Sequence, residues 1–369
     1  MSTKEKSLNS QKRLSGFIVN GVLILICLLW TIPTIGVLIT SFRDSKDIFT
    51  TGWWTVLPHQ AYLQTGEVKV NPDVDVDGPI TIEGVTHTFV EWREGVKMPD
   101  GKKLTWYGNK RTRTLIMEEQ KFQWFSVNLT MDNYKNVLSG QNFSYKDAQG
   151  NEIVRQGSNL STAFLNSVAV AIPATIIPIL IAAFAAYGFA WINFPGRKFF
   201  FTVVVALLVV PLQLALVPIL QDYTKLNLNG TYLAMWLAHT GFGLPLAIYL
   251  MFNYISTIPR DILESAFIDG ASNFTIFTQL VLPLSVPALA SFAIFQFLWV
   301  WNDYLVALVF LGDQNRVVTV ALAAMVGEKG QDWHLLTSGA FISMILPLII
   351  FFALQRYFVR GLMAGSVKG

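Results

Sequence analysis

Residues 163–190 read AFLNSVAVAIPATIIPILIAAFAAYGFA and contain no charged side chain. A helix needs about 20 mostly apolar residues to cross a bilayer, so this stretch is long enough to span one. Hydrocarbon offers no hydrogen-bonding partner to the backbone, and a helix satisfies its backbone groups internally. The stretch therefore predicts a transmembrane helix and decides the fold class.

Five further stretches are comparably long and apolar, at residues 16–39, 199–220, 232–254, 284–311 and 336–357. The first follows several basic residues, as a signal peptide would. Its apolar run is longer than the 7–15 residues typical of a signal peptide, so we expect a retained helix. The sequence predicts an all-α membrane protein with six transmembrane helices.

The composition agrees with this prediction. Only 14% of the residues are charged and 53% are hydrophobic, whereas soluble domains carry about 25% charged residues. The net charge is +3 and the basic residues are scattered, which argues against nucleic acid as a partner. With Cys27 as the single cysteine, no disulfide within the chain is possible.

The four histidines are far apart in the sequence, and none forms a pair with metal-ligand spacing. They are His59, His87, His239 and His334. We interpret each as an ordinary surface or interfacial residue, and we expect no metal site.

Basic residues near the predicted spans indicate the orientation, because Lys and Arg accumulate in cytoplasmic loops. Most of them lie before the first span, at residues 197–198, at residue 260 and at or after the end of the last span, whereas the short loops on the other side hold only Lys225, Arg316 and Lys329. This pattern predicts that both termini lie in the cytoplasm.

Residues 43–158 are too polar to lie in the membrane. Alternating apolar and polar residues over 79–92 and 103–107 predict short strands, and Gly78, Gly84, Gly95 and Gly101 predict turns. We expect a small β-rich external insert between the first and second helices. The chain is thus divided into residues 1–42, 43–158 and 159–369.

Prolines are unusually common inside the predicted helices and include Pro33, Pro173, Pro178, Pro211, Pro218, Pro245 and Pro347. Neighbouring helices in a membrane bundle can satisfy the carbonyls that proline leaves free. The prolines indicate either structural kinks or a gated pathway, and the sequence favours the pathway only slightly.

Residues 256–287, STIPRDILESAFIDGASNFTIFTQLVLPLSVP, form the most informative loop. Ser256 or Thr257 is expected to cap a helix with Pro259 in its first turn. Gly270 is expected to end that helix in a left-handed conformation, and a second helix is expected to begin at Ser272 or Asn273 and to run to Pro283.

This loop carries Asp261, Glu264 and Asp269 against a single Arg260. An amphipathic helix that rests on lipid headgroups usually carries Lys and Arg instead. The acidic face therefore favours docking to a protein with basic groups over binding to lipid.

Three groups of residues in the loop, Glu264-Ser265-Ala266, Asp269-Gly270-Ala271 and Leu282-Pro283-Leu284, resemble the EAA loop of ABC-importer permeases. Ser265 replaces the usual first alanine. The resemblance implies a type I ABC importer permease whose loop docks on an ATPase subunit and couples its closure to the membrane helices. The implied coupling residues are Glu264, Ser265, Ala266, Asp269, Gly270 and Ala271.

Residues 125–138, the pairs Asn166-Ser167 and Trp301-Asn302, and residues 359–369 are similar to the MalG-type carbohydrate permeases. In that group the C-terminal tail reaches the ATPase dimer, which implies this role for Gly365, Ser366, Val367, Lys368 and Gly369. A loop between the last two helices contacts a periplasmic or lipid-anchored sugar-binding protein, which implies this role for Gly327, Glu328, Lys329, Gly330, Gln331, Asp332 and Trp333. The long insert resembles that of the α-glucoside permeases.

The resemblance implies a permease subunit of an ATP-driven importer of a di- or oligosaccharide, possibly an α-glucoside, that acts with a second permease subunit, an ATPase dimer and membrane lipid. It also implies that the protein lies in the inner membrane of a bacterial cell. The chain has no G-x-x-x-x-G-K-[ST] segment, so ATP and Mg²⁺ are expected on the ATPase and no cofactor on this chain. An ion-coupled carrier is one alternative, and a membrane-bound glycosyl-transfer enzyme that uses the insert's carboxylates is another.

Gln296, Trp299 and Asp303 share one face of the predicted fifth helix, because they are spaced i, i+3 and i+7. They are candidates for the substrate path, since an ionisable residue within a span often marks one. The alternative is that Asp303 and Asn302 lie near the outer interface and bind the partner permease.

Overall fold

The computed structural model describes residues 3–44, 47–48, 51–124, 129–140, 142–146, 152–156, 159–325 and 333–364. The chain separates into two compact units, Met1–Thr130 and Met131–Gly369.

The first unit contains α1, whose segment Leu14–Ser41 is long and apolar enough to span a membrane, and then a β-rich insert. Its elements are α1 (Thr3–Ser41), η1 (Trp53–Val56), β1 (His59–Lys69), β2 (Ile80–Ile82), β3 (Val85–His87), α3 (Phe89–Glu94), β4 (Val96–Lys97), β5 (Lys103–Trp106) and β6 (Thr114–Gln123). Four strands form an antiparallel sheet in the order β1-β6-β5-β4, and β2 and β3 form a hairpin.

The insert closes around a small core that includes Trp92, Trp106 and Leu104. The strand pattern predicted over residues 79–92 is correct for β2 and β3 and wrong beyond them, where α3 begins. The reason is local: Thr88 and Glu91 form a capping box, in which each side chain accepts a hydrogen bond from the other residue's backbone N–H. The long pair β1–β6 was not predicted, because its outward residues are mostly polar and show little alternation.

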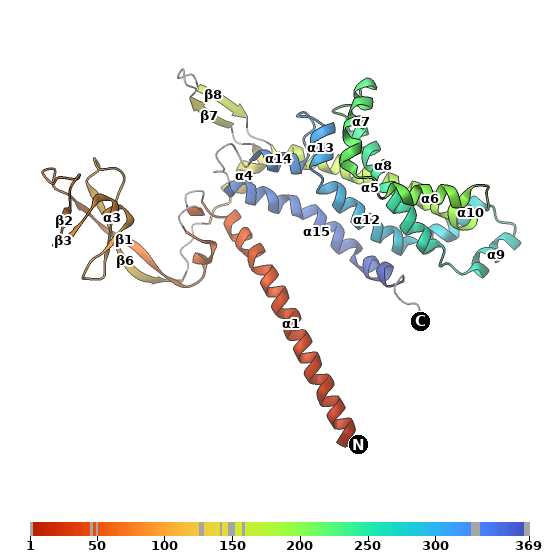
Figure 1. Ribbon diagram of the computed structural model, residues 1–369, viewed down its shortest axis with the longest axis horizontal. Helices are drawn as coiled ribbons and strands as arrows, with labels where there is room; N and C mark the ends of the chain where they lie inside the picture. Colours follow the sequence, from red (N-terminus) through yellow and green to blue (C-terminus); the bar gives the residue numbers. More distant parts are fainter. Residues whose placement is uncertain are drawn as a thin grey trace. The chain divides into compact units, whose positions relative to one another are not determined.

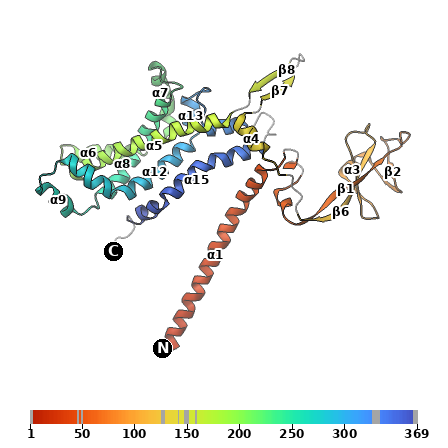
Figure 2. The ribbon, with the colours of Figure 1, turned by 180° about the vertical axis from the view of Figure 1, so that it is seen from behind.

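The second unit begins with α4 and the hairpin β7–β8, two elements that the sequence-based division had grouped with the insert. Its elements are α4 (Asp132–Ser139), β7 (Asn142–Lys146), β8 (Glu152–Gln156), α5 (Leu160–Trp191), α6 (Arg197–Leu207), α7 (Leu212–Lys225), α8 (Tyr232–Ile255), α9 (Arg260–Ile268), α10 (Asn273–Ile276), the π-helical turn η2 (Phe277–Val281), α11 (Leu282–Leu284), α12 (Val286–Trp301), α13 (Leu305–Phe310), α14 (Val318–Met325) and α15 (Trp333–Ala364). Figures 1 and 2 show α5, α8, α12 and α15 running side by side, with α9 at one end of this bundle and α13 and α14 at the other.

Among the described residues, α1, α5, α8 and α15 are each long and apolar enough to cross a membrane alone. Two bent pairs bring the number of candidate spans to six if each pair is one span: α6 with α7, bent by 99°, and Asn273–Leu284 with α12, bent by 71°. The single helix predicted over residues 199–220 is thus broken. Pro211, at the N-cap of α7, supplies no backbone N–H and disfavours helical geometry in the residue before it.

Three prolines of the bundle each leave one carbonyl without its helical donor, and a side chain of a neighbouring helix replaces that donor. Pro173 and Pro178 free the Ala169 and Ala174 carbonyls of α5, which accept hydrogen bonds from Trp236 Nε1 (3.0 Å) and Gln296 Nε2 (3.2 Å). Pro347 frees the Ser343 carbonyl of α15, which accepts from Trp301 Nε1 at 3.0 Å. At these three sites a neighbouring helix satisfies the proline-freed carbonyl, as a packed membrane bundle allows.

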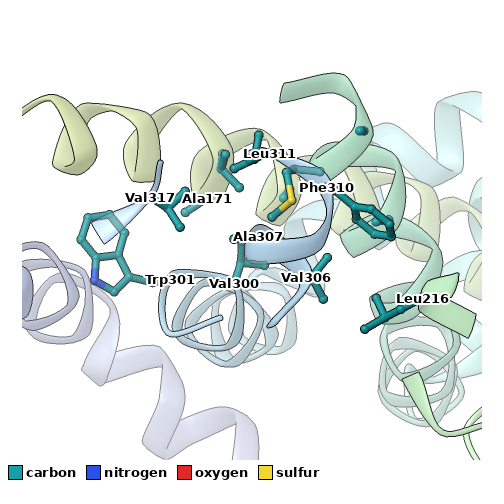
Figure 3. Close-up of a cluster of buried hydrophobic side chains, with 14 of the residues drawn as sticks. Ala171, Leu216, Val300, Trp301, Val306, Ala307, Phe310, Leu311 and Val317 are labelled. Atoms are coloured by element: carbon teal, nitrogen blue, oxygen red, sulfur yellow. The ribbon is translucent and has the colours of Figure 1, made fainter. Parts of the chain in front are cut away.

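The main apolar cluster of this unit brings together α5, α7, α8, α12, α13 and the segment that precedes α14. Figure 3 shows Trp301 and Val300 of α12, Phe310 and Leu311 near the end of α13, and Ala171 of α5 within it. The cluster fixes the C-terminal half of α12, where Gln296 and Trp299, two of the candidate substrate residues, lie.

Candidate functional site

The loop between α8 and α12 folds as two short helices, as the sequence predicts, but its first cap differs from the prediction. Pro259, not Ser256 or Thr257, is the N-cap of α9. The Thr257 hydroxyl donates instead to the Tyr254 carbonyl at 2.7 Å, which closes the end of α8. Leu263 is fully buried, so it fixes the inward face of α9.

Gly270 closes α9 with a φ of +82°, the left-handed conformation that glycine adopts without steric cost. The Ala271 N–H donates to the Ala266 carbonyl and the Gly270 N–H donates to the Phe267 carbonyl, both at 3.0 Å. This pair of hydrogen bonds is a Schellman motif, which makes the turn after α9 tight and defined.

The second helix begins at Asn273, where the Ser272 side chain accepts from the Thr275 N–H at 3.1 Å. Tyr187 of α5 donates its hydroxyl to Asn273 Oδ1 at 3.2 Å and packs its ring against Phe277. The loop is therefore fastened to the helix bundle at its second half, and α12 continues directly from it after the bend at Ser285.

The outward surface of α9 combines acidic and apolar side chains. Asp261, Glu264 and Asp269 are exposed, and no salt bridge joins them to any residue that the structure describes. Phe267 and Ile268 are exposed beside them. A surface with unpaired carboxylates around exposed apolar side chains can accept a protein partner that supplies basic groups and an apolar contact.

A cavity of about 750 Å³ lies between α6, α7, α8 and α12. Its lining is mainly aliphatic and aromatic, with Asp222, Tyr223, Gln296 and Trp299 as the polar contributors. Two of the three candidate substrate residues, Gln296 and Trp299, thus line one cavity, and Asp303 is not part of its lining. Asp222 and Tyr223 could not be identified from the sequence, because the bend between α6 and α7 places them in the cavity wall.

Gln296 is almost fully buried and uses its amide to join three helices. Its Nε2 donates to the Ala174 carbonyl of α5 and, at 3.4 Å, to the His239 carbonyl of α8. Gly243 makes room for it, since a Cβ at that position would lie 2.7 Å from the Gln296 amide atoms. The amide nitrogen is therefore occupied by structural hydrogen bonds.

Asp303 follows the end of α12 and acts as a cap for α13. Its carboxylate accepts from the N–H groups of Val306 (3.3 Å) and Ala307 (2.9 Å), and its carbonyl accepts from the Thr319 hydroxyl. These contacts give Asp303 a structural role that neither sequence-based alternative included.

His239 corrects the interpretation of the histidines, because it is fully buried. Its Nε2 lies 3.7 Å from Asp303 Oδ2, and its ring meets Trp299 edge to face, with 5.0 Å between ring centroids. His239, which does not line the cavity, thus packs against Trp299, which does. In the part of the chain that the structure describes, no group of three or more His, Cys, Asp or Glu side chains could hold a metal ion.

Residues 327–332, implied for binding-protein contact, and residues 365–369, implied for ATPase contact, fall outside the described residues. Trp333, at the end of the first of these segments, is the exposed first residue of α15.

Comparison with known proteins identifies the family. The family model described as "Binding-protein-dependent transport system inner membrane component" matches residues 168–363. The α-glucoside transport system permease protein AglG of Rhizobium meliloti (strain 1021) is 45% identical, over 94% of this chain and 95% of that protein. The osmoprotective compounds uptake permease protein GgtD of Synechocystis sp. is also 45% identical, over 93% of this chain and 89% of that protein.

The fold is also similar to that of a solved structure, a chain of a bacterial ABC transporter involved in the import of the acidic polysaccharide alginate. The TM-score is 0.51 at 19% identity, and the match covers 64% of this chain and 82% of that chain. The comparisons give no support to an ion-coupled carrier or to a glycosyl-transfer enzyme. This chain belongs to the family of binding-protein-dependent transport system inner membrane components, and it is a multi-span permease subunit.

Proposed function

We propose that the chain is a permease subunit of an ATP-driven sugar importer and that residues 256–284 couple it to a separate ATPase. The observation that carries this proposal is the continuity of the loop with the cavity. α9 offers unpaired carboxylates, the Schellman turn holds α9 against the second helix, and α12 leads from that helix to Trp299 in the cavity wall.

In this mechanism Glu264 pairs with a basic residue of the ATPase, and Ser265, Ala266, Gly270 and Ala271 keep the contact surface free of bulky side chains. Closure of an ATPase dimer, which binds ATP and Mg²⁺, displaces α9. Because the second helix of the loop is tied to α5 through Tyr187 and Asn273, the displacement reaches α5 and α12 together and changes access to the cavity.

The proposed assembly contains a second permease subunit and a periplasmic or lipid-anchored sugar-binding protein. Residues 327–333 would contact the binding protein, and residues 365–369 would reach the ATPase dimer. Both termini would lie in the cytoplasm. The distribution of basic residues supports this orientation.

The proposed substrate is a di- or oligosaccharide, with an α-glucoside as the first candidate. This proposal rests on the 45% identity to the Rhizobium α-glucoside permease, which extends over the insert as well as the spans. The equal identity to the Synechocystis permease makes osmoprotective compounds the second candidate. Trp299 and Gln296 would face the substrate path, since an indole ring suits stacking on a sugar ring.

The coupling role is tested by the charge reversal Glu264→Lys, with Glu67→Lys on the exposed surface of β1 as a matched control. Glu264→Lys is expected to abolish uptake and to leave membrane insertion intact, whereas Glu67→Lys retains uptake. Normal uptake by the Glu264→Lys chain would contradict the coupling role.

The energy source and the substrate are tested in cells that express the complete transport system. Uptake is expected to stop on ATP depletion and to survive an ionophore, and α-glucosides are expected to compete for uptake better than non-sugar osmolytes. Uptake that fails with the ionophore alone would contradict ATP coupling, and competition only by osmolytes would replace the α-glucoside assignment.

A further inference from the structure

The insert exposes a group of large apolar side chains where it joins α1. We name this group the neck patch, and it consists of Trp54, Leu57, Phe122, Trp124 and Leu129. Trp54 is 60% exposed and Trp124 is 67% exposed, and Phe122 and Trp124 form an edge-to-face ring pair with centroids 5.6 Å apart. Isolated apolar residues on a surface are common, but a group that includes three large aromatic side chains indicates an interaction surface.

Several contacts place these residues near the C-terminal end of α1 within the first unit. His59 lies opposite Gln123 at the start of the β1–β6 pair, so Leu57 and Trp124 flank the same end of that ribbon. Leu129 forms an isolated bridge with Arg43, two residues beyond the end of α1. The Trp53 indole covers Gly36 in the last turns of α1, where a Cβ would lie 2.6 Å from the ring nitrogen.

At the other end of the insert, the tryptophan side chains are buried. Trp92 and Trp106 are almost completely buried, and their indole nitrogens donate to the carbonyls of Ile80 (3.0 Å) and Asn109 (2.9 Å). The insert therefore buries tryptophan where it forms its own core and exposes tryptophan only beside the transmembrane helix.

We propose that the neck patch inserts into the headgroup region of the bilayer at the surface where α1 leaves the membrane. Two observations favour lipid over a protein occupant. The patch lies near the C-terminal end of α1, which exposes many large apolar side chains and whose segment Leu14–Ser41 meets the criteria for a span. Its tryptophans also match the residue type that gathers at membrane interfaces, where an indole combines an apolar ring with a polar N–H.

The burial of Arg43 is compatible with this position. Arg43 is almost fully buried, and its Nη2 donates to the carbonyls of Asp47 (2.7 Å) and Thr51 (3.0 Å), so the cation nearest the end of α1 is turned into the protein. The neck patch itself contains no charged side chain. Anchoring would hold the base of the β1–β6 ribbon at the bilayer surface and limit how freely the insert swings about the end of α1.

The proposal is tested by spin labels on the full-length chain in phosphatidylcholine vesicles. Cys27 is first replaced by serine, and single cysteines are placed at Trp54, at Trp124 and, as a matched control, at Tyr107, which is equally exposed. Tyr107 pairs with Thr114, about 30 Å along β6 from Gln123 at roughly 3.3 Å per residue. Collisions with oxygen, which concentrates in hydrocarbon, are compared with collisions with a water-soluble nickel complex.

Labels at 54 and 124 are expected to collide more with oxygen than with nickel, and the label at 107 is expected to show the reverse. Nickel access at 54 and 124 equal to that at 107 would overturn the proposal. Shielding of 54 and 124 from both reagents would overturn it too, because protein would then cover the patch.

A second measurement keeps the patch residues unlabelled. Gln60 lies directly opposite Phe122 and points to the same face of the ribbon, so a label there reports on the patch from beside it. The triple substitution Trp54→Ser, Phe122→Ser and Trp124→Ser is expected to raise nickel access at position 60 several-fold. An unchanged label at position 60 would contradict anchoring.

Discussion

The insert and the helical unit form their buried interiors from different kinds of side chain. The insert surrounds a few large side chains, chiefly Trp92, Trp106 and Leu104, with a small sheet. The helical unit packs α5 through Ala171, Ala174, Ala182, Ala183 and Ala186, and it uses side-chain donors to satisfy proline-freed carbonyls.

The difference follows from the solvent. In water the burial of large apolar surface stabilises a domain, so the insert depends on a few bulky side chains. In lipid this driving force is absent between helices, and close backbone approach and interhelical hydrogen bonds take its place. The insert should therefore be sensitive to lost volume, and the helical unit should be sensitive to lost donors and added volume.

The largest effect is expected for Trp92→Ala in the insert. The substitution removes a fully buried indole and leaves the Ile80 carbonyl without its donor, which should cost about 3–5 kcal/mol in the free energy of unfolding. The insert should then become sensitive to trypsin in membrane vesicles while the helices stay protected. Tyr107→Ala, at an exposed site, is the control. Equal digestion of the two variants would show that the core does not depend on Trp92.

An intermediate effect is expected for Trp301→Phe in the helical unit. Loss of the indole N–H leaves the Ser343 carbonyl unsatisfied, which should cost about 0.6–2 kcal/mol. In a Pro347→Ala background the backbone regains an N–H for that carbonyl, so Trp301→Phe should cost less. Thermal unfolding of all four chains in detergent gives the coupling energy, and strict additivity would mean that the indole does not compensate for the proline.

Two glycines of α8 test the effect of added volume. Gly243→Ala should displace the Gln296 amide and lower the thermal stability by about 1 kcal/mol, the size of one membrane hydrogen bond. Gly241→Ala meets nothing within 4 Å and should be neutral or stabilising. Similar losses for both variants would contradict the close fit at Gly243.

The smallest effect concerns the pH dependence of the insert. Hydrogen bonds from the Thr88 backbone and hydroxyl and from His87 lower the pKa of Glu91 below its ordinary value. The ionised carboxylate therefore stabilises the insert above the ordinary pKa, and this contribution is lost as the pH falls through the lowered pKa. Glu91→Gln should flatten this part of the acid profile of the insert's sensitivity to pepsin, a protease that is active at low pH. An unchanged profile would show that Glu91 does not cause the acid sensitivity.

The sequence predicted the structure correctly where the structure depends on interactions between residues close in the chain. The apolar runs predicted α5, α8 and α15, and Gly270 ended α9 because the turn needs a left-handed residue. The sequence contains the capping box of Thr88 and Glu91, but the alternation of residues 79–92 predicts strand over the whole stretch. The capping box is a local helix signal, but it covers only the first turn of the short helix α3.

Other features depended on neighbours that are distant in the sequence. Asn166 and Ser167 carry only a family resemblance in the sequence, and the structure gives them a role. Asn166 Nδ2 donates to the Arg316 carbonyl, and Ser167 Oγ accepts from the Val318 N–H. Asp303 could not be assigned from the sequence either, because its partners include Thr319 and His239.

The sequence by itself determined that this protein spans a membrane, that a polar segment separates its first two spans, and that a small-residue acidic loop precedes α12. Hydropathy, proline and glycine act within a few residues, so they can be interpreted from the chain alone. Only the tertiary structure decided which donor serves each proline-freed carbonyl, where the cavity lies and which tryptophans are left exposed. These outcomes depend on which helices and strands become neighbours, because a hydrogen bond or a buried contact needs two groups that the sequence keeps apart.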